Sequence, residues 1–192
     1  DHTPPPATAP RPTASASGAG LYVQAEDADG DLLSYAIDYR LEGETAWRVL
    51  RRDLGDQIYV WDTTSTPDGR YEVRLRASDA PANTADRSLE GDRIAETVQV
   101  DNTPPVVTTS VLRDGAGVRL VVQVVDASSP VQKLEISLTG GQWQLVHPVD
   151  GLADSLEERF EIPLASDGDV ARVVVRATDL LQNVATRAGA GR

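Results

Sequence analysis

The chain has 192 residues, of which 40% are hydrophobic and 25% charged, and its formal net charge is −12. This composition is typical of a globular protein and excludes a chain that is disordered throughout. The acidic balance argues against nucleic acid as a partner. The longest apolar run, at 120–125, is interrupted by Gln123 and is too short for a membrane span, which needs roughly 20 residues.

Cysteine and methionine are both absent from the chain. The absence of cysteine excludes a disulfide framework, a thiolate nucleophile and a metal site with Cys ligands. Because Asp1 stands where an initiator methionine would be, we expect the chain to be a fragment of a longer protein, in which a signal peptide can precede it.

An internal repeat with a displacement of 100 positions organises the chain. The segment RASDAPANTADR at 76–87 recurs as RATDLLQNVATR at 176–187, and DHTPP at 1–5 recurs as DNTPP at 101–105. A repeat of this length matches the common size of an independently folding domain. We therefore predict two domains, 1–100 with a Pro-rich lead-in and 101–192.

In the first copy, alternating apolar and polar residues predict a series of short strands after the Pro-rich lead-in. The expected strands are at about 8–16, 21–27, 33–41, 45–51, 57–63, 71–79 and 93–100. Within 71–79, Tyr71, Val73, Leu75 and Ala77 fall on one side of the strand, which predicts that they lie in the core.

The second copy predicts strands at about 106–112, 118–126, 131–138, 142–147, 158–164 and 171–177. Core positions are expected at alternate residues of two of these strands. They are Leu134, Ile136 and Leu138, then Ala171, Val173, Val175 and Ala177. A single helical turn near 151–157 is the one exception to strands that the sequence allows, and the strand after Asn183 is expected to be short, weakened by glycine or truncated.

Short strands spaced by about 8–12 residues, without an amphipathic helix, indicate an all-β fold. Each copy is long enough for seven such strands, which favours two layers packed face to face. The predicted fold is two tandem antiparallel β-sandwiches.

Two segments resemble known families of β-sandwich. YEVRLRASD at 71–79, after a Pro-Asp-Gly turn, resembles strand F of fibronectin type III-like modules, with Tyr71 as the corner tyrosine. ATDLLQN at 177–183 resembles the Ala-x-Asp-x-x-Gly-Asn segment of bacterial immunoglobulin-like modules, although Gln182 replaces the glycine and Ala171 the corner tyrosine. The whole layout is similar to the C-terminal module pair of large secreted bacterial proteins that contain β-propellers, through WDTTSTPDGRYEV at 61–73, VDNTPP at 100–105 and HPVDGLADSLEERF at 147–160. That resemblance implies a fold without catalytic residues.

The acidic segment EDADGD at 26–31 is the candidate metal site that the sequence suggests. Asp27, Asp29 and Asp31 alternate along it, and carboxylate oxygens are the ligands that Ca²⁺ prefers. Leu32 stands where an EF-hand loop has glycine, so the alternative is a solvated turn between two strands. We expect weak Ca²⁺ binding at most, and no other cofactor.

Other constellations favour packing over chemistry. Trp47 and Trp143 occupy corresponding places in the two copies, which predicts burial, although a carbohydrate platform that includes Trp61 is the alternative. His147, Asp150 and Ser155 are residue types of a catalytic triad, but no nucleophile elbow accompanies them. The sequence therefore does not predict an enzyme.

The function that these observations favour is a non-enzymatic spacer or interaction module of a larger exported bacterial protein. Such a protein would be secreted, periplasmic or on the cell surface. Its expected partners are other domains of the same polypeptide and proteins or glycans at the cell surface, with no nucleic acid and no membrane span. The alternatives are a carbohydrate-binding accessory module and a dimerisation or signal-relay domain beside a propeller sensor.

Overall fold

The computed structural model describes residues 7–15, 18–25, 32–54, 58–95, 97–115, 117–138 and 140–189, with only the backbone described for 7–25. The chain divides into two compact units, Asp1–Val100 (unit 1) and Asp101–Arg192 (unit 2). Among the described residues, no helix combines the length and the apolar character that crossing a bilayer requires.

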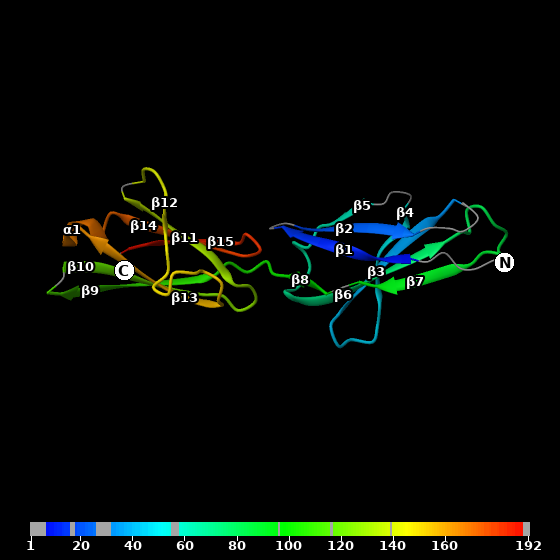
Figure 1. Cartoon of the computed structure of the whole chain (residues 1–192), viewed down its shortest axis with the longest axis horizontal. Coiled ribbons are helices and arrows are strands. Elements are labelled where there is room, and N and C mark those ends of the chain that lie inside the picture. Colours follow the sequence, from blue (N-terminus) through cyan, green and yellow to red (C-terminus); the bar gives the residue numbers. More distant parts are fainter. Residues whose placement is uncertain are drawn as a thin grey trace. The chain divides into compact units, whose positions relative to one another are not determined.

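Unit 1 consists of two antiparallel sheets (Figure 1). One sheet has the order β1-β2-β5, and the other has the order β4-β3-β6-β7, with β8 also paired to β6. The strands are β1 (Ala7–Ser15), β2 (Gly18–Ala25), β3 (Ser34–Leu41), β4 (Arg48–Leu54), β5 (Ile58–Trp61), β6 (Gly69–Ser78), β7 (Glu90–Ile94) and β8 (Val98–Val100).

Unit 2 repeats this arrangement, with sheets β9-β10-β13 and β12-β11-β14-β15 (Figure 1). In both units the first, second and fifth strands form one sheet and the remaining strands form the other. The strands are β9 (Val106–Asp114), β10 (Gly117–Val125), β11 (Val131–Leu138), β12 (Gln144–Val146), β13 (Glu157–Leu164), β14 (Val173–Asp179) and β15 (Val184–Ala188). The prediction of an all-β fold with antiparallel sandwiches is confirmed.

Each unit has its own hydrophobic core. In unit 1 the alternation in β6 is confirmed, because Tyr71, Val73, Leu75 and Ala77 are all buried. In unit 2 the core is filled by residues from both sheets, and this is what makes the unit a sandwich. Its buried members are Val107, Leu120, Val122, Val124, Val131, Leu134, Ile136, Phe160, Ile162, Val173, Val175 and Ala177.

Tyr71 forms the corner that its sequence context predicts. Its hydroxyl donates a hydrogen bond to the Pro67 carbonyl oxygen at 2.8 Å. Because the ring is buried in the core, this bond fixes the turn before β6 to the sandwich.

Two predicted core residues are exposed instead. Leu138 is 50% exposed because it is the last residue of β11, where the chain leaves the sheet. Ala171 is exposed because it caps the C-terminus of the helix α1 (Asp167–Val170) with φ −72°, so that β14 begins only at Val173.

The expectation of a helical turn near 151–157 is wrong. Among the described residues, the helix is α1, which lies further along the chain. Around 151–157 the backbone is bonded elsewhere: the Glu158 carboxylate accepts the amides of Asp154 and Ser155, and the Ser155 carbonyl accepts the Val131 amide. At α1, the Ser166 amide donates to the Asp169 carboxylate at 3.0 Å, which supports the first turn.

Several strand boundaries also differ from the expectation. The strand predicted at 93–100 is split into β7 and β8, because the Ala95 amide bonds to the Val73 carbonyl and the pairing to β6 changes register. The strand predicted at 45–51 begins only at Arg48. The final strand β15 has 5 residues, as short as expected.

Candidate metal centre

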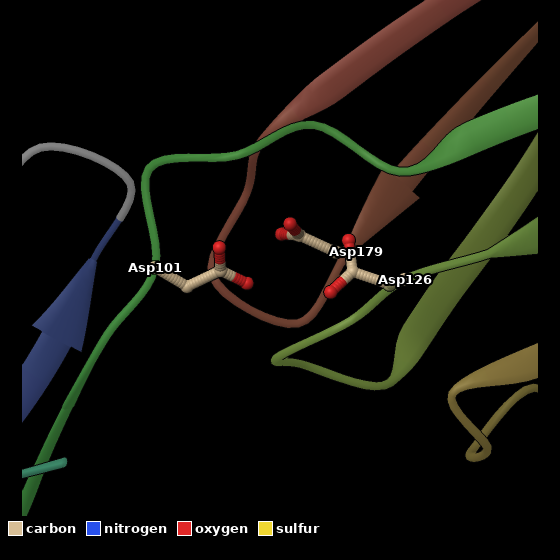
Figure 2. A group of neighbouring side chains, drawn as sticks. All are labelled: Asp101, Asp126 and Asp179. Atoms are coloured by element: carbon tan, nitrogen blue, oxygen red, sulfur yellow. The ribbon is translucent and has the colours of Figure 1, made fainter. Parts of the chain in front are cut away.

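Three aspartates from distant parts of unit 2 meet at one end of its sandwich. Asp101 precedes β9, Asp126 directly follows β10, and Asp179 is the last residue of β14. One carboxylate oxygen from each lies within 4.8 Å of those from the other two. Figure 2 shows the three carboxylates turned toward a common centre.

Each aspartate is held in place because it accepts backbone amides of its own turn. Asp101 Oδ1 accepts the Thr103 amide at 3.1 Å, and Asp126 Oδ1 accepts the amides of Ser128 and Ser129 at 2.9 and 2.8 Å. Asp179 Oδ1 accepts the Asn183 amide at 2.8 Å. Short acidic side chains favour such turns, so the local sequence explains the orientation of all three carboxylates.

The Asn183 side chain joins two of these segments. Its Nδ2 donates to the Asp101 carbonyl oxygen at 2.9 Å and to Asp179 Oδ2 at 2.8 Å. It therefore links the chain entering unit 2 to the turn between β14 and β15. This is a structural role for the asparagine of the ATDLLQN segment.

The cluster is buried and strongly acidic. Asp101 and Asp126 are each 5% exposed and Asp179 is fully buried. Burial raises the pKa of the Asp101 carboxyl above its ordinary value, and the charges of Asp126 and Asp179 raise that pKa further, against the lowering effect of the nearby Ser129 hydroxyl and the Thr103 amide. Three acceptor-only groups in one small space form an oxygen-rich site suited to a hard cation.

The metal ligands suggested by the sequence, Asp27, Asp29 and Asp31, lie outside the described residues. The sequence nevertheless carried a signal for the cluster in unit 2. Asp101 and Asp179 both lie in the repeated segments, DNTPP and RATD, and Asp126 opens the turn DASSP that corresponds to EDADGD. Their convergence depends on the strand topology, which the period alone does not give.

The tryptophans do not form a flat platform. Trp61 is 3% exposed in the core of unit 1, whereas Trp143 is 37% exposed and stacks under the Arg176 guanidinium at 4.2 Å. Trp47 is half-buried beneath Arg40 and Arg74, at 4.3 and 4.5 Å. The predicted burial is therefore wrong for Trp143, because a cation–π contact on the outer sheet face takes the place of the core.

Two of the three triad residue types bond to residues of their own turns. The Ser155 hydroxyl donates to Asp154 at 3.2 Å, and the Asp150 carboxylate accepts the Leu152 amide. His147 is exposed. The serine and the aspartate thus have turn-stabilising partners.

A hollow of about 450 Å³ lies in unit 1 beside β3, β4 and β5. Aromatic rings line it, with Tyr39 and Trp61 centroids 4.9 Å apart and Trp61 and Tyr71 centroids 5.7 Å apart. Tyr59 completes the aromatic lining, and the charged residues that line the hollow are Glu44, Arg48, Asp62 and Asp68.

No family model and no curated protein matches this chain. Among solved structures, the FN1–FN3 domains of chicken CNTN1 are similar to 96% of this chain, with 14% sequence identity and a TM-score of 0.39. The chain spans 65% of the length of that one.

Proposed function

We propose that the chain is a non-enzymatic pair of β-sandwich modules that acts as a spacer or interaction element in a larger exported bacterial protein. The observation that carries this proposal is the presence of two separate cores built on the same strand order. A module with its own core folds as a unit and bears load or presents a surface without help from its neighbours.

The distribution of charged residues supports this function. On the outer face of the β4-β3-β6-β7 sheet, Arg74 and Arg76 both bind the buried carboxylate of Asp38 at 2.8 Å. Arg76 also reaches Glu90 at 3.1 Å, and Arg40 pairs with Glu72. These ion pairs hold neighbouring strands together. Such a structural role for charged residues is consistent with a spacer or interaction module.

Force spectroscopy on the whole chain tests the spacer role. We expect two cooperative unfolding steps, each releasing a contour length of about 30 nm, because a unit of about 90–100 residues extends by roughly 3.3–3.6 Å per residue. Unfolding without discrete steps would contradict the proposal. Light scattering tests the competing dimerisation role. A mass near 20.6 kDa indicates a monomer, and twice that mass indicates a dimer.

Carbohydrate binding is the second candidate, and the aromatic hollow of unit 1 is the observation that favours it. Sugar rings stack on aromatic faces, which the half-buried Tyr39 and Tyr59 offer here, and the charged residues of the lining offer hydrogen-bond partners for hydroxyl groups. If the hollow binds glycans, a glycan array gives hits that Tyr59→Ala removes and Trp143→Ala retains. An array without hits, or hits that persist in Tyr59→Ala, would leave the hollow as a surface feature of the sandwich.

A further inference from the structure

We propose that Asp101, Asp126 and Asp179 bind a divalent cation at the end of unit 2, and that this cation is Ca²⁺. This site lies in unit 2, whereas the EDADGD segment suggested by the sequence lies in unit 1, and the two share no residue. The proposal does not depend on the spacer role, because it concerns the residues of one unit.

The first argument is the charge that the cluster leaves uncompensated. The three carboxylates are at most 5% exposed, and within the described part of the chain none of them forms an ion pair with Arg, Lys or His. Buried charges in proteins are paired or coordinate metals, because an isolated buried charge is very costly. A cation placed between the three oxygens supplies the missing positive charge.

The second argument is that turn formation does not require these charges. Each aspartate uses Oδ1 to accept amides of its turn. Asparagine or serine caps such turns equally well without bringing three negative charges within 4.8 Å of one another. The negative charges of the three carboxylates are therefore not explained by turn formation.

An independent observation lies beside the cluster, at Ser129. The residue is 2% exposed, and its hydroxyl forms no hydrogen bond of normal geometry, a costly state for a buried polar group. The hydroxyl lies near Asp101, whose Oδ2 also lacks a hydrogen-bond partner. Ser129 Oγ thus offers a fourth oxygen, and coordination of a cation satisfies both orphaned atoms.

The ligand chemistry and the spacing select Ca²⁺. The donors are all oxygens, which suit hard cations more than transition metals. Two oxygens bound to one ion are separated by at most twice the metal–oxygen distance, about 4.6–5.2 Å for Ca²⁺ and about 4.0–4.2 Å for Mg²⁺. Oxygens within 4.8 Å of one another lie close to the spacing that Ca²⁺ bridges, so a small contraction of the cluster brings all three into its coordination distance. Mg²⁺, which demands stricter geometry and holds its water, would bind more weakly.

The bound ion would join three segments that the sequence separates widely. These are the chain that enters unit 2 at Asp101, the turn after β10 and the turn after β14. Asn183 already links the first and third of these segments. Ca²⁺ would add the turn after β10 to that connection, so that unit 2 gains stability when the ion is present.

The test is calorimetry of the whole chain in chelator and in 5 mM CaCl₂. With a dissociation constant of about 10⁻⁴ M, we expect the midpoint of unit 2 to rise by roughly 5–15 °C. In Asp126→Asn, which keeps the turn-capping oxygen, the Ca²⁺-dependent rise should disappear. In chelator, the same variant should melt no lower than the wild type, because it removes a repelling charge.

A matched variant distinguishes Ca²⁺ binding at this site from nonspecific attraction of Ca²⁺ to an acidic protein. Asp150→Asn changes an exposed aspartate in a turn of the same unit and should keep the full rise. Isothermal titration of the wild type with Ca²⁺ and with Mg²⁺ gives a readout that does not depend on any variant folding. The proposal is overturned if the wild type shows no heat of Ca²⁺ binding and coincident melting curves, or if the rise persists in Asp126→Asn.

Discussion

Two leucines of strand β11 show how one residue position decides a side chain's contribution to stability. Leu134 is fully buried in the core of unit 2, and Leu138, four residues later on the same strand, is 50% exposed. Both fit the alternating pattern of the sequence. Only the structure separates them, because the alternation breaks at the end of the strand, where Ser137 is buried and Leu138 is exposed.

We therefore predict opposite outcomes for the same substitution at these two positions. Leu134→Ala should lower the free energy of unfolding of unit 2 by about 2–5 kcal/mol, through lost burial and the cavity that remains. Leu138→Ala should change it by less than about 0.5 kcal/mol, as is usual for exposed sites. Urea denaturation monitored by circular dichroism measures both. Equal effects at the two positions would show that the register assigned to β11 is wrong.

At the scale of elements, the Asp38 carboxylate joins β3 to β6. It accepts hydrogen bonds from Arg74 and Arg76, which lie on the neighbouring strand. Burial alone would raise the pKa of Asp38, but the hydrogen bonds and charges of Arg76 and Arg74 outweigh it and hold the pKa below the ordinary value of 3.8. The ionised carboxylate is therefore stabilised more in the folded than in the unfolded chain.

The sign of the resulting pH dependence follows from that lowered pKa. The stabilisation is fully present above about pH 4 and is lost as the pH falls through the folded pKa, because the unfolded chain then binds the proton first. Asp38→Asn should remove this acid-sensitive part and lower the free energy of unfolding of unit 1 at pH 7 by about 1–3 kcal/mol. Denaturation curves between pH 2.5 and 7 provide the measurement, with Asp68→Asn as an exposed control. A wild type and an Asp38→Asn variant with parallel pH profiles would contradict the assignment.

Elements with regular alternation were predictable, and those that depend on distant partners were not. The strand β6 follows its sequence pattern throughout, and β11 follows it from Leu134 to Ile136, because side chains of a strand alternate between two faces. The helix α1 escaped prediction because it has only 4 residues and depends on the contact of Ser166 with Asp169. The aspartate cluster escaped for another reason: residues 101, 126 and 179 are far apart in sequence, and only the order of strands in the two sheets brings them together.

At the scale of the whole molecule, the repeat of the sequence corresponds to a repeat of topology. Both units place strands of the same rank in the same sheets, although few residues besides the repeated segments are shared. The two core clusters have no residue in common. Each unit thus buries its own apolar surface, which is the physical condition for independent stability.

This independence leads to a prediction about coupling between mutations. Leu75 is fully buried in the core of unit 1 and Leu134 in that of unit 2. We expect two unfolding transitions. Leu75→Ala should lower the midpoint temperature of one of them, and Leu134→Ala that of the other. In the double variant, the losses in free energy should add within about 0.3–0.5 kcal/mol, as they do for distant sites without shared partners. Calorimetry of the wild type, both single variants and the double variant completes the cycle. Two outcomes would contradict this independence: a single transition whose midpoint temperature both substitutions lower, or an interaction energy above about 1 kcal/mol. Either would mean that the two sandwiches unfold as one body, because core residues this far apart in the chain are coupled only through shared packing.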